Sequence, residues 1–367
     1  MYKLFNILDF NSDLFIIDNL IYNEPINIHN CDNKYLSCAE FDNVVDFYDL
    51  DDGSNRQKWI IINDTNDKNI FYIKCAFNRY NYTQYLGCPN KDGIVYLYTS
   101  QNNFTKWSIT NIENKNYSIK YIGDKFNKNE IELVVARYNE NIQWVLAYND
   151  VATIYNKGNK INLLFNNIVN LDNIGREGHT YLYHIINKID NISNQTTFCQ
   201  GNPFDHNETI LYGIDNYIYF DAVQPLGLRY LKIYNTPPIY IENKLKIKTK
   251  YGLEYLIINV DKNHNYLKPN FFNDLGVKNI INQYNKRFPH CKSLFENFLN
   301  RSQFPITKQL DIVRATWCGL FSVSKINILK YDINVYKNLL AELISYNLQG
   351  GENGYILERL WLYIFEN

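Results

Sequence analysis

The sequence predicts a two-domain protein, with an all-β region over residues 1–128 and an α/β region over residues 129–367. The length of 367 residues fits two domains of ordinary size. Up to about residue 125, short apolar segments alternate with turns rich in Asn, Asp and Gly, and no helical period persists. From about residue 130, strand-like and helix-like segments alternate, which predicts a mostly parallel sheet with helices on its faces.

The composition excludes several classes of protein. The net charge is −1 and no basic block occurs, so nucleic acid is not an expected partner. No apolar run reaches the roughly 18 residues of a membrane span, and the first residues lack the pattern of a secretory signal. The seven cysteines include no Cys-x-x-Cys pair, which is typical of free thiols in a reducing compartment. We therefore expect a cytoplasmic protein.

The N-terminal region contains an internal repeat. One copy carries KYLSC (34–38) and RQKWIII (56–62), and the other carries QYLGC (84–88) and FTKWSIT (104–110). The order of these strands resembles the β-trefoil, and the Gln-Lys-Trp triplet resembles the QxW element of ricin-B-type lectins. The Tyr-Leu strand is similar to those of fascin-like trefoils. The resemblance implies a third unit, which would combine residues 117–123 with the first strands of the chain.

A trefoil-like module would bind carbohydrate or dock a partner. Trp59 and Trp107 are predicted to lie in its core, because such residues build the centre of a trefoil. Sugar binding would instead need exposed aromatic rings and polar side chains in the turns, and Asp49, Asp51 and Asn90 are candidates.

In the C-terminal region, polar side chains follow the predicted strands at their carboxyl ends, where α/β proteins bind ligands. Arg137, Asn139 and Glu140 follow the first strand, and Lys157 follows the second. An Arg137–Glu140 ion pair at a helix start and a plain Asn-Lys-Gly turn are the alternatives.

The segment Gly-Arg-Glu-Gly-His, residues 175–179, precedes a predicted helix. The free N–H groups and the dipole of a helix N-terminus suit an anion. Arg176, Glu177 and His179 are therefore candidate ligand-binding residues, although Glu177 would also stabilise the helix start by itself.

Six motifs in order carry a resemblance that covers nearly the whole second half: VVARYNENIQWV, IYNKG, NIGREGHTYLYHII, FCQGNPFDH, CGLFSVS and ERLWLYIF. They resemble a family of domains without an established function, whose members are expected to be distant relatives of the GT-A nucleotide-sugar transferases. The resemblance implies a GT-A-like sheet. It also implies that Arg137 and Glu140 contact the nucleotide and that Lys157 and Arg176 contact its diphosphate.

The same resemblance implies a metal site and a general base. Gln200, Asp205 and His206 follow the strand where GT-A enzymes place an Asp-x-Asp motif that holds Mn²⁺ or Mg²⁺. The match is incomplete because a single Asp, beside a His, stands there, so Asp205 is the candidate metal ligand. Glu358, on the last helix one turn from Trp361, would be the general base on an acceptor hydroxyl. Alternatively, Glu358 pairs with Arg137 or Arg176, and Trp361 belongs to the core.

The sequence thus predicts a glycosyltransferase that moves a sugar from a nucleotide sugar to a glycan or protein acceptor. Glu358, Asp205 and His206 would be catalytic, and Mn²⁺ or Mg²⁺ is the candidate cofactor. The alternative is a non-catalytic carbohydrate-binding or structural protein with a degenerate transferase fold. A hydrolase using Asp205 and His206 ranks last, because no nucleophile elbow accompanies them.

Overall fold

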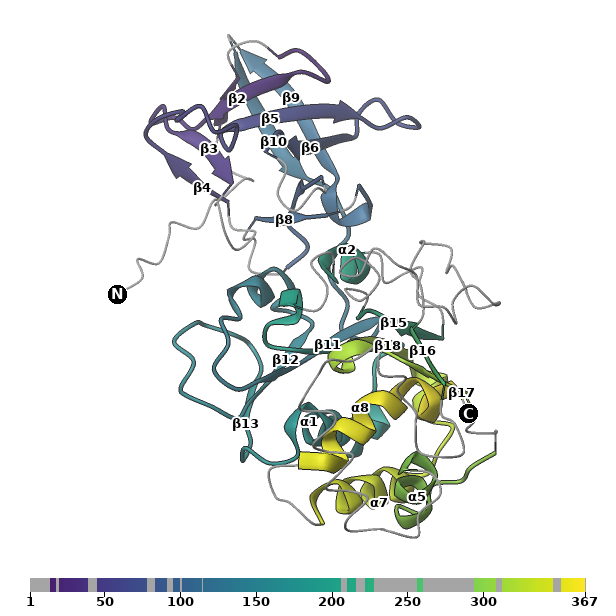
Figure 1. Cartoon of the computed structure of the whole chain (residues 1–367). Coiled ribbons are helices and arrows are strands. Elements are labelled where there is room, and N and C mark those ends of the chain that lie inside the picture. Colours follow the sequence, from purple (N-terminus) through teal and green to yellow (C-terminus); the bar gives the residue numbers. More distant parts are fainter. Residues whose placement is uncertain are drawn as a thin grey trace. The chain divides into compact units, whose positions relative to one another are not determined.

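The computed structural model describes residues 14–17, 20–38, 45–77, 83–90, 95–99, 101–113, 115–205, 210–215, 222–227, 256–259, 294–307, 312–345 and 351–366. The chain forms two compact units (Figure 1). The N-terminal unit comprises Met1–Asn127, Gln143–Val151 and Leu211–Asn216. The C-terminal unit comprises Lys128–Ile142, Ala152–Ile210 and Tyr217–Asn367.

The N-terminal unit is a ten-stranded, barrel-like antiparallel sheet. Its strands are β1 (Leu14–Ile17), β2 (Pro25–His29), β3 (Tyr35–Cys38), β4 (Val45–Tyr48), β5 (Lys58–Asn63), β6 (Phe71–Cys75), β7 (Tyr85–Gly87), β8 (Tyr96–Tyr98), β9 (Trp107–Glu113) and β10 (Asn116–Tyr121). The strands β1, β2, β5, β6, β9 and β10 pair in a closed ring. The hairpins β3–β4 and β7–β8 extend from β2 and β6 (Figure 1).

The internal repeat is visible in the core of this unit. Trp59 and Trp107 are both fully buried, which confirms their predicted place. The Trp59 indole donates to the Leu36 carbonyl at 2.7 Å, and the Trp107 indole donates to the Leu86 carbonyl at 2.8 Å. Each tryptophan therefore ties one Tyr-Leu strand to the ring in the same way.

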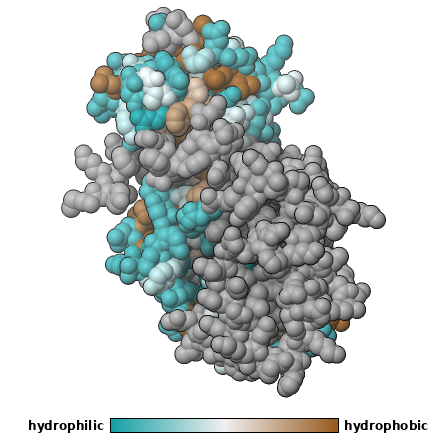
Figure 2. Space-filling view, in the orientation of Figure 1, coloured by the Kyte–Doolittle hydropathy of each residue, from teal (hydrophilic) through white to brown (hydrophobic). Residues whose placement is uncertain are grey.

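The all-β prediction holds for this unit, whereas the trefoil resemblance is not confirmed by the described residues. The described strands supply two strand–hairpin–strand units, and β1 pairs directly with β10 where a third would close. These strands come from opposite ends of the unit, so no continuous described segment forms a third hairpin. On the face seen in Figure 2, the described surface of this unit is mostly hydrophilic with scattered hydrophobic side chains, as is ordinary for a protein surface.

Two segments that follow the barrel in the sequence fold with it. Asp215 ends the short helix α2 (Ile210–Asp215), and its buried carboxylate accepts the backbone N–H of Thr99 at 2.6 Å and the Tyr148 hydroxyl at 2.6 Å. Burial raises the pKa of Asp215 to about 6. Asn90 donates to the carbonyls of Leu146 and Ala147. Asn90 is fully buried, so it is a structural residue and not part of an exposed sugar-binding turn.

The C-terminal unit contains a six-stranded mixed sheet in the order β13-β12-β11-β14-β18-β15. The strands are β11 (Ile131–Arg137), β12 (Ala152–Asn156), β13 (Ile168–Asn170), β14 (Gln195–Gln200), β15 (Val223–Pro225) and β18 (Phe321–Ser324). The first four are parallel, whereas β18 runs antiparallel to β14 and to β15. A separate antiparallel pair joins β16 (Leu256–Asn259) to β17 (Ile312–Ala315).

The predicted mostly parallel, GT-A-like α/β fold is therefore wrong. In the described stretch from β11 to β14, α1 (Arg176–Lys188) is the one α-helix, and β12 connects to β13 without a helix. An apolar run such as that of β18 predicts burial but carries no information on strand direction. The strand returns to the sheet after a long excursion of the chain, so no crossover rule sets its direction.

Among its described residues, the C-terminal unit has four further α-helices. They are α5 (Leu294–Arg301), α6 (Lys325–Ile328), α7 (Ile333–Ile344) and α8 (Gly351–Glu366). The helices α7 and α8 pack against α1 (Figure 1). Trp361 on α8 is fully buried and stacks on Phe321 with 5.5 Å between ring centroids, so it belongs to the core. Within the described residues, no helix has the length and apolar character to cross a membrane.

A buried polar network fastens α1 to the sheet. His184 on α1 is fully buried, with Nε2 3.3 Å from a carboxylate oxygen of Glu132 on β11 and Nδ1 3.0 Å from the Tyr155 hydroxyl. Thr153 donates to the same carboxylate at 2.7 Å. Burial alone would raise the pKa of Glu132, but the hydrogen bond and charge of His184 prevail and lower it to about 2.

We expect Glu132→Ala to destabilise the protein by about 3 kcal/mol, because it leaves the buried Thr153 hydroxyl without its acceptor and the buried His184 ring without the carboxylate beside it. Glu130→Ala is the matched control: this exposed glutamate, two positions earlier in the chain, accepts a solvent-exposed hydrogen bond from Asn194 at 3.0 Å, and its loss should cost under about 1 kcal/mol. Urea denaturation followed by circular dichroism measures both.

The pH dependence of this effect has a definite sign. The folded pKa of Glu132, about 2, lies below the ordinary value of 4.5, so its stabilisation is present above pH 4.5 and is lost as the pH falls towards 2. The stability difference between wild type and Glu132→Ala should therefore shrink in acid. A difference that grew as the pH fell would contradict the ion pair.

Candidate functional site

The carboxyl ends of the central parallel strands lie side by side. Arg137 at the end of β11 is in register with Asn156 at the end of β12, and Ala136 is in register with Gln200 at the end of β14. The candidate residues that follow these strands are thus placed along one edge of the sheet. They separate into two groups with different contacts.

The first group is a closed network around Arg137. The Arg137 guanidinium donates to the Glu140 carbonyl at 3.0 Å, to the Asn156 side chain at 2.6 Å and to the Asn159 carbonyl at 2.9 Å. Asn139 accepts the backbone N–H of Asn159 at 2.8 Å. Arg137 therefore holds two loops together, and it contacts the carbonyl of Glu140 rather than forming the alternative ion pair with its carboxylate.

The Glu140 carboxylate is also used inside this network. It accepts the backbone N–H of Tyr138 at 2.6 Å and lies against Gly201, which directly follows β14. A Cβ atom on Gly201 would come within 2.7 Å of the Glu140 carboxylate oxygen. Arg137, Asn139 and Glu140 thus shape the sheet edge, and the nucleotide contacts expected of them remain predictions.

The second group gathers at the N-terminus of α1. Lys157 reaches from the end of β12 and donates to the carbonyl of Ile174 at 2.7 Å and to that of Arg176. Burial lowers the pKa of Lys157 to about 8. Gly175 and Arg176 both have left-handed backbone angles, with φ of 59° and 52°. Because such a φ strains a non-glycine residue, the Lys157 brace stabilises a turn that Arg176 would not adopt readily.

A pair of carboxyl groups lies beside this turn. Burial raises the pKa of Glu177, in the first turn of α1, to about 7, and the charge of Glu358 contributes to the increase. Glu358 on α8 is 7% exposed and accepts the backbone N–H of Cys318 at 2.9 Å. Two helices far apart in the sequence therefore bring Glu358 close enough to Glu177 for its charge to raise the pKa of Glu177.

Arg176 lies beside Glu177 of this pair and is partly exposed to solvent. Its Nε lies 3.8 Å from a Glu177 carboxylate oxygen, and its guanidinium carbon lies 4.1 Å from the centre of the Tyr355 ring. The side chain is 40% exposed. A Cβ on Gly354 would lie 3.2 Å from the Arg176 side chain, so a small residue on α8 leaves room for it.

Two neighbours of this pair, Cys318 and Gly319, were not among the candidate site residues taken from the sequence. Cys318 has a left-handed φ of 53°, and Gly319 lies so close that a Cβ there would be 3.6 Å from both the Glu177 side chain and the Trp361 indole nitrogen. Burial and the charges of Glu358 and Glu177 raise the pKa of the Cys318 thiol. It is therefore a neutral thiol. The Cys-Gly dipeptide was the one available signal of this tight turn.

Two buried donors in this region have no hydrogen-bond partner among the described residues. They are the hydroxyl of Tyr181 and the indole N–H of Trp361, both on fully buried side chains. Unpaired buried polar atoms are rare in proteins, and they concentrate at sites that bind ligands or water. The carboxyl pair thus lies near buried donors to which the described residues offer no acceptor.

The remaining candidates lie apart from the carboxyl pair or outside the described residues. His179 is 7% exposed, and burial together with Lys157 lowers its pKa to about 4, so it is neutral and packs on Tyr183. Asp205 accepts the Asn202 amide at 2.8 Å at an exposed position. His206 lies outside the described residues. Over the described part of the chain, no three His, Cys, Asp or Glu side chains are grouped as metal ligands.

We name the set Lys157, Arg176, Glu177 and Glu358 the carboxyl-pair site. It unites four sequence candidates from β12, α1 and α8. The Gln200 side chain contacts the Cys318 thiol, which lies beside this site. This site is wholly within the C-terminal unit.

Comparison with known proteins identifies this part of the chain. Residues 133–367, which include every residue of the carboxyl-pair site, match the family model described as a protein of unknown function, DUF3431. None of the curated proteins matches the chain. The chain therefore belongs to the DUF3431 family of proteins of unknown function.

Proposed function

We propose that the C-terminal unit is a glycosyltransferase, which moves a sugar from a nucleotide sugar to a hydroxyl of a glycan or protein acceptor. The observation that carries the proposal is the carboxyl pair, Glu177 and Glu358, with Arg176 at its surface. The proposal rests on these side chains and not on the GT-A-like sheet, which the fold contradicts.

A buried carboxyl pair suits proton transfer at neutral pH. Two nearby carboxylates do not ionise independently, so one of them holds its proton to a higher pH. The pKa of Glu177, about 7, places its proton exchange near the operating pH, where a general base or acid is most effective. Glu358 is fixed by the Cys318 N–H and supports Glu177 by its charge. The role of general base thus moves from Glu358, as the sequence suggested, to Glu177.

Arg176 is the group proposed to meet the leaving diphosphate. It is exposed, whereas the ammonium group of Lys157 is occupied by two carbonyls and the guanidinium of Arg137 is occupied by its loops. A guanidinium forms charge-assisted bonds to phosphate oxygens. Its present ion pair with Glu177 would weaken when a phosphate arrives, which would further free that carboxyl group for proton transfer.

A divalent metal ion would bind through a different residue, Asp205. Mn²⁺ or Mg²⁺ bound through Asp205 would neutralise a leaving diphosphate. Asp205 is exposed, and its described contact is with Asn202. No step assigned to Arg176 or Glu177 depends on the ion, so the two ideas are tested separately.

Ligand binding is the first test. Wild type should be stabilised against heat by a UDP-, GDP- or CMP-sugar, measured with and without Mn²⁺, because a ligand that binds the folded state raises Tm. Arg176→Gln should weaken the affinity roughly tenfold or more, as expected for loss of a charge-assisted phosphate contact. Lys188→Gln, an exposed cation at the far end of α1, is the control and should leave the shift unchanged.

The outcomes discriminate between the proposals. No shift with any nucleotide sugar, together with no effect of Arg176→Gln, would overturn the transferase proposal. Binding without sugar transfer to any acceptor would favour the non-catalytic alternative, and release of free sugar would favour a hydrolase. Transfer that persists in Glu177→Gln would exclude Glu177 as the base.

The Glu177 pKa also predicts a stability effect that needs no substrate. Its folded value of about 7 lies above the ordinary 4.5, so ionisation destabilises the folded state progressively as the pH rises from 4.5 to 7. Glu177→Gln should therefore stabilise the protein at pH 8 by about 1–3 kcal/mol and change little at pH 4. Glu130→Gln, at an exposed glutamate, should show no such pH dependence in thermal melts at the two pH values.

A further inference from the structure

The N-terminal unit contains a cavity of about 430 Å³ between β2, β3 and the loop that follows β4. Its polar lining comes from Asn27, His29, Tyr35, Asp51 and Lys58, and the rest is apolar. This volume lies at the lower end of the range of roughly 300–1,000 Å³ that is typical of small-molecule sites. The family match begins at residue 133, so no assignment reaches this cavity.

Three of these side chains form a neutral polar cluster. The Lys58 ammonium lies 2.9 Å from an Asp51 carboxylate oxygen and donates to the Asn27 side-chain carbonyl. The Asn27 amide in turn donates to Asp51 at 3.1 Å. Each group is oriented by the other two, so the cluster presents fixed donors and acceptors without a net charge.

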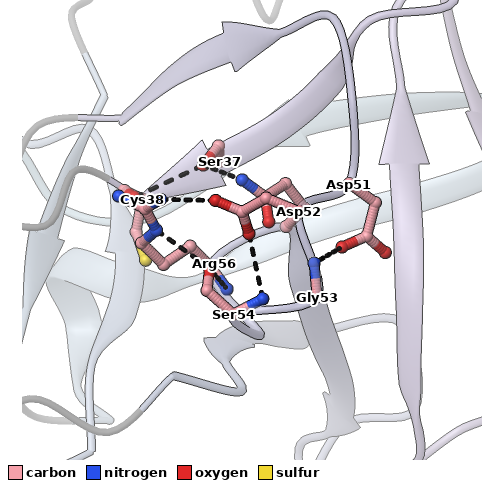
Figure 3. A network of polar contacts seen from close by, with 8 residues as sticks. Ser37, Cys38, Asp51, Asp52, Gly53, Ser54 and Arg56 are labelled. Carbon is pink, nitrogen blue, oxygen red and sulfur yellow. Dashed lines mark hydrogen bonds and ion pairs between the residues drawn. The ribbon is translucent and has the colours of Figure 1, made fainter.

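The loop that carries Asp51 is held by contacts of its own (Figure 3). Asp51 accepts the backbone N–H of Gly53 at 3.0 Å, and Gly53 has the left-handed φ of 75° that this tight turn requires. Beyond the turn, Arg56 donates to Ser54 at 2.9 Å and pairs with Asp52. The position of Asp51 is therefore set before any ligand arrives, which lowers the cost of binding.

The internal repeat supplies a natural comparison, because the second copy has different residues at these positions. Ile26 pairs with Trp59 in the first copy, and Phe71 pairs with Trp107 in the second. The next residue is Asn27 in the first copy and Tyr72 in the second, by the same register.

Tyr72 is a large residue where Asn27 is small. It is 4% exposed, and its hydroxyl donates to Asp64 at 2.8 Å. His29 in the first copy and Lys74 in the second occupy equivalent positions, three residues after Ile26 and Phe71. Each pairs with the tyrosine of its Tyr-Leu strand, Tyr35 or Tyr85. The barrel therefore does not require Asn27 and His29 in the cavity lining, since the second copy builds the same pairing with Tyr72 and Lys74. Lys58 and Tyr35 have the same residue types in the second copy, Lys106 and Tyr85.

The chemistry of the lining selects the class of ligand. A simple anion or cation would have to compete with the Asp51–Lys58 pair, whose side chains are only partly exposed, and would leave one of them without its counter-charge. A hydroxyl group both donates and accepts, so adjacent hydroxyls bind the Asn27, Asp51 and Lys58 cluster without disturbing its charge balance. Tyr35, whose ring lies 4.2 Å from that of His29, offers an aromatic face beside the cluster.

We propose that this cavity binds a neutral, polyhydroxylated small molecule of the size of a mono- or disaccharide, held by Asn27, Asp51 and Lys58. The site lies in the N-terminal unit and is independent of the carboxyl-pair site and of the transferase proposal.

The test measures binding of glucose, galactose, mannose, N-acetylglucosamine and lactose to the full chain by isothermal titration calorimetry. At least one should bind wild type. Asn27→Tyr, which places the residue of the second copy in the cavity, should weaken that binding about tenfold or more. Lys58→Gln, which removes a donor without adding bulk, should also weaken it. Lys106→Gln is the matched control, because Lys106 precedes Trp107 as Lys58 precedes Trp59, and it should bind as wild type does.

Two further measurements separate this site from alternatives. Glu177→Gln should bind the saccharide as wild type does, so failure of either proposal leaves the other standing. Circular dichroism confirms that each variant is folded, and a misfolded Asn27→Tyr leaves Lys58→Gln to decide. The proposal is overturned if no saccharide binds, if phosphate or sulfate binds in preference, or if folded Asn27→Tyr and Lys58→Gln bind as tightly as wild type.

Discussion

The contact between His184 and Glu132 is the constraint on which the functional geometry of the C-terminal unit depends. It fixes α1 on β11 in the middle of a core where few polar groups occur. The helix therefore begins at a defined point beside the ends of β12 and β14. Lys157 then sets the left-handed turn at Arg176, and Glu177 meets Glu358 on α8. Without the buried pair, α1 would lose the polar contact that holds it where its first turn meets Lys157 and Glu358.

The candidate residues divide into those that build the edge of the sheet and those that remain available to a ligand. Arg137, Asn139 and Glu140 use their polar groups on neighbouring loops. Arg176 and Glu177 are held by backbone geometry and keep partly open side chains. A charged residue at the end of a strand can either stabilise the neighbouring loops or bind a ligand. Its hydrogen-bond partners in the structure show which of the two roles it can have.

Local patterns in the sequence predicted the features that depend on nearby residues. The repeat placed Trp59 and Trp107 in the core, and alternation placed Lys157 and Gln200 at the ends of strands. Features set by distant parts of the chain were not predictable in this way. The direction of β18 and the strained turn at Cys318 depend on segments that meet only in the folded protein. The pairing of β1 with β10, by contrast, agrees with the predicted combination of residues 117–123 with the first strands of the chain. Burial patterns identify such segments but not their partners or their direction.

The return of residues 143–151 and 211–215 to the N-terminal unit changes how the chain can be divided. Asp215 and Tyr148 lie within the span matched by the family, yet they complete the packing of the barrel through Thr99. No single cut after residue 128 separates two self-sufficient halves. A fragment that begins at residue 129 would contain residues 143–151 and 211–215 without the barrel against which they pack. The barrel alone would in turn expose Thr99, which binds Asp215 in the whole chain. Each unit is therefore built from segments that are not contiguous in the sequence, and a single residue number cannot serve as the boundary between them.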